Sequence, residues 1–156
     1  MAESRRERAV ALFMEGYGCA QAVLGAFADA AGLDFDTAMR LASSFGAGMG
    51  RMREVCGTCS AMFMIAGLLD GAASPDPHEK ARQYALVQRL AARFREKNGT
   101  IVCRELLAGL KADTRPTPAA RDAEYYRVRP CVRFVGDAAE ILEEYLAARG
   151  GESGDI

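Results

Sequence analysis

The stretch from Cys56 to Leu69 constrains the fold more than any other part of this 156-residue chain. It is dense in Ala, Met, Phe, Ile and Leu and carries no charged side chain. Such a composition is typical of a helix that is buried on most of its surface. Its longest apolar run, residues 61–69, is roughly half as long as a membrane-spanning helix needs to be. We therefore expect this segment to be the central helix of a bundle, without membrane insertion.

Apolar residues at helical spacing predict further helices on both sides of this segment. Ser4 and Glu7 have the spacing of a capping box, which marks the start of the first helix. In the long helix that follows the central one, Tyr84 and Phe94 are expected on the same apolar side. The polar segment 111–129, which contains Pro116 and Pro118, is predicted as a loop. Besides the central segment, we expect helices over residues 4–16, 19–32, 34–43, 78–98, 103–110 and 131–149.

The expected fold is an all-α, single-domain bundle of about six to seven helices. The chain has the length of one ordinary domain, and it can enclose a core without disulfide or metal support. It shows no internal repeat and no convincing strand. We expect one cysteine-containing helical domain over residues 1–150, followed by a flexible tail over residues 151–156.

Charge and the N-terminal sequence limit the expected partners and location. Lys and Arg number 20 and Asp and Glu number 21, so the net charge is −1. No basic field attracts phosphates over a distance, which argues against a nucleic-acid partner. Residues 1–15 mix Arg with Glu and lack the apolar core of a secretory signal, so a cytoplasmic location is expected. The apolar surface of segment 56–69 could be covered internally or by a second copy, which favours a homodimer.

Three glycines at alternate positions, Gly46, Gly48 and Gly50, mark an unusual backbone in segment 44–50. A phosphate-binding loop would follow a strand and end in Lys followed by Ser or Thr, and neither feature is present. We therefore predict a tight loop that supports a nearby site.

Five cysteines are an odd number for a disulfide framework, and in a reducing compartment they indicate metal ligation or redox chemistry. Cys19, Cys56 and Cys131 are each expected in the first turn of a helix, where free amide groups and the helix dipole lower a thiol pKa. The plainer interpretation is that some of them are small core residues. Arg51 and Arg53 would favour a thiolate or bind an anion, or they are solvated loop arginines.

Cys56 and Cys59 form a CxxC pair, a spacing that serves disulfide exchange, zinc binding and iron–sulfur ligation. The βαβ surroundings of a thioredoxin-like site are not expected here. The single histidine, His78, is expected on a polar surface turn, so a metal site would have to be built from cysteines or carboxylates. Cys103 and Cys131 lie far along the chain, and only the fold could bring them to the pair.

Five ordered segments carry a family resemblance: residues 16–24 (GYGCAQAVL), residues 44–51 (SFGAGMGR), Cys56-Gly57 with Gly67-Leu68, residues 103–107 (CRELL), and Cys131. In this order they resemble the C-GCAxxG-C-C family of small proteins regarded as redox-active, over most of the chain. The resemblance implies that the four recurring cysteines of the family correspond to Cys19, Cys56, Cys103 and Cys131.

The chain departs from the family at the central motif. Where the family pattern reads CGAxxG, this chain reads CGTCSA, so that Thr58 replaces Ala, Ala61 replaces the last Gly, and Cys59 is additional. The extra thiol could be a resolving partner for Cys56, a supplementary ligand, or a neutral packing substitution.

Two functional hypotheses follow, and neither decides whether the chain is an enzyme. In the first, Cys19, Cys56, Cys103 and Cys131 converge for thiol/disulfide or electron-transfer chemistry with an unidentified redox partner. Cys56 is then the most activated thiolate and Cys59 its resolving partner. In the second, Cys19, Cys56, Cys103 and Cys131 are ligands of an iron–sulfur cluster or zinc in a non-enzymatic binding protein. A helical structural domain with inert cysteines is the third interpretation.

Overall fold

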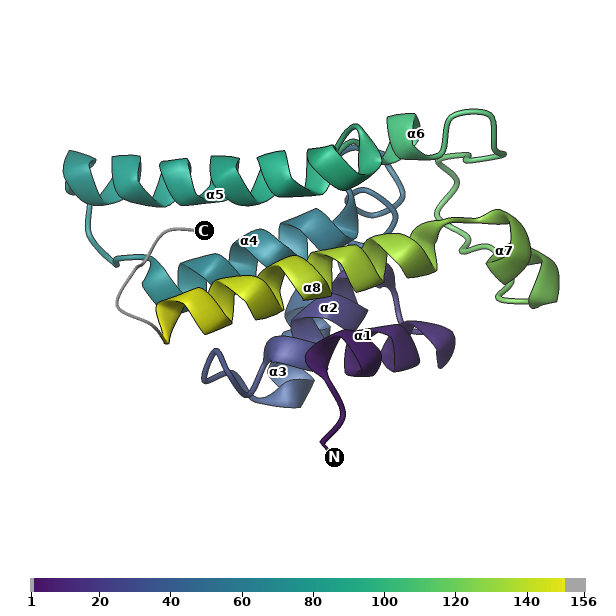
Figure 1. Ribbon diagram of the computed structural model, residues 1–156. Coiled ribbons are helices and arrows are strands. Elements are labelled where there is room, and N and C mark those ends of the chain that lie inside the picture. The colour runs from purple at the N-terminus through teal and green to yellow at the C-terminus, as the bar shows by residue number, and fades with distance from the viewer. Residues whose placement is uncertain (1, 151–156) are drawn as a thin grey trace.

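Eight helices follow one another along the chain in the computed structural model, which describes residues 2–150 (Figure 1). Six of them are longer than α6 (Cys103–Leu106) and α7 (Ala123–Val128): α1 (Arg5–Met14), α2 (Cys19–Phe27), α3 (Phe35–Ala42), α4 (Gly57–Asp70), α5 (Pro77–Asn98) and α8 (Cys131–Arg149). No strand occurs between residues 2 and 150, so the chain forms a single all-α domain, as expected. The predicted tail, residues 151–156, lies outside the described residues.

The centre of the bundle is shared between two helices. The apolar helix α4 packs against α2, α5 and α8, while α2 packs against α1, α3, α4 and α8. Figure 1 shows α5 running above α4 and α8, with α1, α2 and α3 on the opposite side. Phe13, Phe27 and Phe94 are among the largest side chains that are fully buried between these helices. Within the described part of the chain, every helix is too short or too polar to cross a membrane.

Local sequence signals explain where several helices begin and end. Ser4 Oγ accepts a hydrogen bond of 3.0 Å from the Glu7 N–H, and Glu7 Oε2 accepts one of 2.8 Å from the Ser4 N–H. The predicted capping box of α1 is therefore confirmed. Asp34 caps α3 by accepting from the Thr37 N–H, and Gly99 ends α5 with a left-handed φ of +87°.

Several expectations from the sequence are wrong. The second helix ends at Phe27 rather than near residue 32, and the helix that begins at Cys103 ends at Leu106 rather than at residue 110. The predicted loop 111–129 contains α7, which begins after Asp122 accepts a hydrogen bond from the Tyr125 N–H. Tyr84 is 61% exposed, whereas Leu90 and Phe94 on the same helix are fully buried. The residues of α5 before Leu86 are mostly exposed, so the apolar periodicity of this helix leads to burial only from Leu86 onward.

Candidate functional site

Four of the five cysteines line one cavity of about 420 Å³. Each lies where a helix starts: Cys19, Cys103 and Cys131 are the first residues of α2, α6 and α8, and Cys56 is the N-cap of α4. Figure 1 shows that α4 and α8 begin at the same end of the molecule, beside α6 and α7. The fold thus collects thiols that are far apart in sequence at a set of helix N-termini, where the helix dipoles are positive.

A short antiparallel pairing brings the segments of Cys56 and Cys103 together. The Cys56 N–H donates to the Ile101 carbonyl at 2.7 Å, and the Cys103 N–H donates to the Glu54 carbonyl at 2.6 Å. Val55 and Val102 form an isolated β-bridge between these bonds. The two cysteines therefore start their helices from adjacent extended segments.

Gly57 brings Cys19 close to the start of α4. A Cβ atom at this position would lie 2.7 Å from Cys19 Sγ and 2.7 Å from the Phe45 carbonyl oxygen. Real Cβ atoms do not approach other heavy atoms this closely, so a larger residue would push the Cys19 sulfur away. This close contact explains why a glycine follows Cys56 in the motif.

The glycine-rich segment forms a left-handed loop over residues 47–51, in which every residue has a positive φ between +54° and +73°. Left-handed backbone costs a non-glycine residue about 1–2 kcal/mol, and Ala47, Met49 and Arg51 all adopt it. Hydrogen bonding from the Ala47 amide partly offsets the rise in the pKa of Cys19, and Ala47 and Arg51 line the cavity. The expected tight loop beside a site is therefore present, and its strain lies at the cavity wall.

Cys56 has the most activated thiol of the five. Hydrogen bonding from the Cys59 thiol, and then from the hydroxyl and amide of Thr58 and the amide of Cys59, lowers the pKa of Cys56 from 9.0 to about 7 against the effect of burial. The Thr58 Oγ1 atom lies 3.1 Å from Cys56 Sγ. These donors are the free amide groups of a helix N-terminus and the side chains of the same first turn.

The pKa values of the other cavity thiols are shifted in the opposite direction, upward. Burial, followed by the negative charge of Cys56, raises the pKa of Cys19 and raises that of Cys131 to about 11. Burial also raises the pKa of Cys103, although Arg53 Nη1 lies 3.8 Å from its sulfur. The expectation that a helix start lowers a thiol pKa therefore holds for Cys56 and not for Cys19 or Cys131, since burial outweighs the dipole there.

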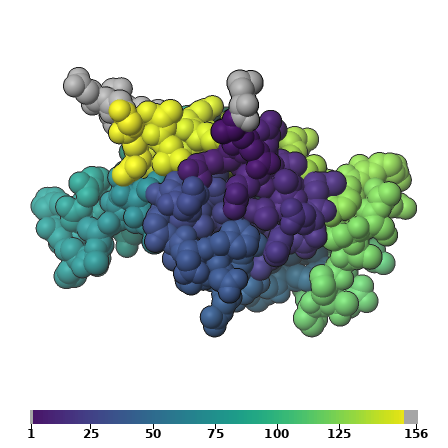
Figure 2. All heavy atoms as spheres, turned by 90° about the horizontal axis from the view of Figure 1, so that it is seen from below, coloured from purple at the N-terminus to yellow at the C-terminus, as the bar shows by residue number. Residues whose placement is uncertain are grey.

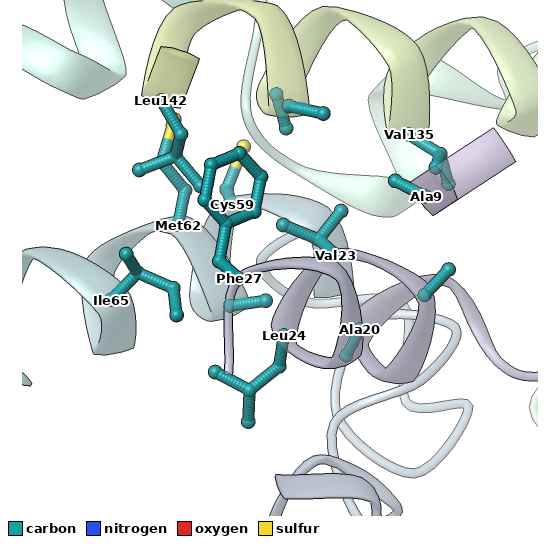
Figure 3. Packing of buried hydrophobic residues seen from close by; sticks show 14 of the residues in the cluster. Ala9, Ala20, Val23, Leu24, Phe27, Cys59, Met62, Ile65, Val135 and Leu142 are labelled. Atoms are coloured by element: carbon teal, nitrogen blue, oxygen red, sulfur yellow. The ribbon is translucent and has the colours of Figure 1, made fainter. Parts of the chain in front are cut away.

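Cys59 does not line the cavity. It follows Cys56 by three residues in the first turn of α4, is fully buried, and belongs to the apolar core shown in Figure 3. Burial and the hydrogen bond to Cys56 raise the pKa of Cys59 far above its ordinary value. The extra cysteine of this chain is therefore both a core residue and a hydrogen-bond donor to Cys56.

The cavity also contains residues that the sequence did not single out. Arg121 and Arg129 line it, together with the predicted Arg51 and Arg53. Tyr125, on the missed helix α7, also lines the cavity, and hydrogen bonding from it partly offsets the rise in the pKa of Cys131. These residues come from segment 111–129, whose prolines and charges gave no sequence signal for a site. His78, by contrast, is exposed on α5, as expected.

The five cysteines are the candidate ligands for a metal site. Across residues 2–150, no group of three or more His, Cys, Asp and Glu side chains is close enough to hold one metal ion. All five cysteines are free thiols. The four cavity thiols therefore surround a shared space without forming a ligand set for a single metal ion.

Comparison with known proteins identifies a family. No curated protein and no solved structure matches the chain. The model of one family matches residues 17–145, which include all five cysteines and every residue of the cavity lining except Phe13. The chain therefore belongs to the family described as "Putative redox-active protein (C_GCAxxG_C_C)".

Proposed function

We propose that this protein is a dithiol–disulfide redox protein in which Cys56 is the attacking thiolate and Cys59 the resolving thiol. The observation that carries the proposal is the first turn of α4. Cys56 faces the cavity with a pKa lowered to about 7, and Cys59 is hydrogen-bonded to it from the core with a raised pKa. A thiolate near neutral pKa combines a high ionised fraction with good nucleophilicity.

The reaction transfers two electrons from the two thiols to a disulfide. The Cys56 thiolate attacks one sulfur of a substrate RS–SR′, so that a Cys56–SR bond forms and R′S⁻ leaves and takes up a proton. Cys59 then loses its proton and attacks Cys56 Sγ, which forms the Cys56–Cys59 disulfide and releases RS⁻. The substrate is reduced to two thiols and the pair is oxidised, and a second dithiol restores the reduced pair by the reverse exchange.

Cys19, Cys103 and Cys131 supply thiols to the same cavity. Their raised pKa values keep them protonated near pH 7 while Cys56 is ionised. Attack on the mixed disulfide by one of them would use the same chemistry as attack by Cys59. We assign the resolving role to Cys59 because it lies in the same first turn of α4 as Cys56 and hydrogen bonding from its thiol lowers the pKa of Cys56.

The test is thiol exchange with neutral 2-hydroxyethyl disulfide at pH 7, followed by mass spectrometry of the products. We expect thiols to be lost in pairs and a Cys56–Cys59 disulfide to be found. Cys56→Ser, which retains a good N-cap residue, should abolish the fast reaction. Cys59→Ala should stop at the mixed disulfide on Cys56.

Two results would contradict the proposal. One is fast exchange that persists in Cys56→Ser. The other is zinc, or iron with sulfide, present in proportion to protein after anaerobic purification, because the cysteines would then be ligands rather than nucleophiles. Cys131→Ser serves as the matched control, since it removes a cavity thiol of raised pKa and should leave the Cys56–Cys59 product in place.

A further inference from the structure

The charged side chains that line the cavity beside Cys56 are all positive. Four arginines line it, Arg51, Arg53, Arg121 and Arg129, and its lining includes no Asp, Glu or Lys. Arg53 is 4% exposed, so its charge is removed from water. A buried guanidinium group is costly unless a negative group compensates it.

Most of this charge has no carboxylate partner. Within residues 2–150, Arg53, Arg121 and Arg129 form no ion pair, and Arg51 lies 3.6 Å from Asp113, a carboxylate that also pairs with Arg115. Backbone carbonyls hold the guanidinium groups instead. Arg53 Nε donates to the Asp113 carbonyl at 3.0 Å, and Arg129 Nη2 donates to the Lys111 carbonyl at 2.6 Å. These bonds orient the two groups without neutralising them, and they use a fraction of the five donors of each.

The Cys56 thiolate supplies a single negative charge inside the cavity. The positive charge of the arginines therefore exceeds the negative charge that the protein provides there. The remaining walls are apolar, with Phe13, Phe134, Pro116 and Pro118 among them. A volume of about 420 Å³ is in the range of pockets that hold small organic ligands, about 300–1,000 Å³.

We propose that the cavity selects small disulfides that carry negatively charged groups on either side of the sulfur–sulfur bond. Arg53 and Arg129, anchored on carbonyls, would bind these groups through charge-assisted hydrogen bonds and so place the disulfide against Cys56. This inference rests on the proposed function, since it names the class of substrate that the same thiolate attacks. The exchange step is the one written above, with the anionic disulfide as RS–SR′.

The test compares three small disulfides that differ mainly in charge. They are 3,3′-dithiodipropionate, which is anionic, 2-hydroxyethyl disulfide, which is neutral, and cystamine, which is cationic. Each second-order rate constant with the reduced protein is divided by the rate constant of the same disulfide with free 2-mercaptoethanol, which removes differences in intrinsic reactivity. We expect the normalised rate to be about tenfold higher or more for the anionic than for the neutral disulfide, and lowest for cystamine. The preference should weaken at high salt.

Two variants test whether the arginines cause the preference. Arg129→Gln and Arg53→Gln should each lower the anionic-to-neutral ratio several-fold, and the ratio cancels any change in the ionised fraction of Cys56. Arg127→Gln is the matched control, because Arg127 is an exposed residue of the same helix end that pairs with Glu124 at 3.6 Å and does not line the cavity. Circular dichroism verifies folding, and Arg129→Gln keeps the test valid if the variant at the buried Arg53 does not fold.

The outcomes separate the two proposals. If the neutral disulfide reacts but the normalised rates are equal for all three, the selectivity inference is wrong and the proposed function stands. The same holds if the anionic preference survives in both arginine variants. If none of the three disulfides reacts with Cys56, the proposed function itself fails.

Discussion

At the level of single residues, the five thiols differ in what surrounds the sulfur atom rather than in their distance from a helix start. Cys56 accepts hydrogen bonds from the first turn of α4, whereas burial dominates around Cys19 and Cys131. The sequence placed Cys19 and Cys131 in a first turn correctly, and Cys56 is the N-cap residue directly before one. The sequence could not rank the three thiols, because burial depends on helices that are remote in the chain.

Removing the Cys59 thiol should raise the pKa of Cys56. We expect Cys59→Ala to move the midpoint of Cys56 alkylation by iodoacetamide upward from about pH 7 by about one unit, since a hydrogen bond to a charged group contributes about 1.5–3 kcal/mol and one pKa unit corresponds to about 1.4 kcal/mol. Reactivity near neutral pH would fall, because less thiolate is present. Mass spectrometry of the Cys56 peptide across a pH series measures the midpoint.

Thr58→Val is the graded comparison for this experiment. It removes a weaker contribution to the same thiolate, so its midpoint should lie between those of wild type and Cys59→Ala. An unchanged midpoint in Cys59→Ala would show that Cys59 is a packing residue and not a donor.

At the level of elements, the start of α4 is more restricted than the rest of that helix. Gly57 faces Cys19 Sγ and the Phe45 carbonyl, while a Cβ at Gly67 on the same helix would meet no atom within 4 Å. Gly67→Ala should therefore stabilise the protein by about 0.5–1 kcal/mol, the usual gain from replacing glycine in a helix. Gly57→Ala should destabilise it by about 1–3 kcal/mol, the range expected for forcing an extra carbon into a well-packed site.

Urea unfolding of the two reduced variants measures this difference. A stabilised Gly57→Ala would mean that Cys19 moves aside at no cost. Titration of the Cys19 thiol in Gly57→Ala gives a second reading, because displacement of its sulfur from the cavity wall changes its reactivity even if stability is unaffected.

Element boundaries were predictable at Ser4 and Gly99, where a cap residue marked them, whereas the helix expected to reach residue 32 ends at Phe27. Helix α7 was missed because it is short and lies between prolines and charges. The left-handed loop was recognised as tight from its glycines, but the left-handed backbone of Met49 and Arg51 was not predictable. This backbone conformation depends on the pairing of residues 53–56 with residues 101–104, and the sequence does not show that pairing.

At the level of the whole molecule, one arginine fastens the segment that covers the cavity. Arg121 donates to the carbonyls of Phe13 and Tyr17, each at 2.9 Å, and its guanidinium carbon lies 4.1 Å from the centre of the Phe13 ring. Figure 2 shows the green segment that contains Arg121 lying against the purple helix α1. Pro116 and Pro118 of this segment form part of the cavity wall.

Arg121→Lys should loosen this segment, because lysine keeps the charge but cannot donate to two carbonyls in a fixed fork. We expect a loss of about 1–2 kcal/mol in stability, faster proteolysis between residues 111 and 120, and faster labelling of Cys131 by a neutral maleimide. Arg115→Lys is the control, since Arg115 is exposed and pairs with Asp113 within the same segment. Labelling and proteolysis at wild-type rates would show that other contacts hold the segment.

The convergence of four helix starts on one cavity also has a consequence for chain topology. A disulfide between any two of Cys19, Cys56, Cys103 and Cys131 would close a loop of about 30 residues or more, and restricting the unfolded chain in this way contributes about 4 kcal/mol. A Cys56–Cys59 bond closes a loop of a few residues and contributes less than about 2 kcal/mol by the same relation. The rise in melting temperature on oxidation, measured by calorimetry, should thus be about twice as large for a long-range bond. Thermal stability would then report which sulfurs the protein joins when it gives up its electrons.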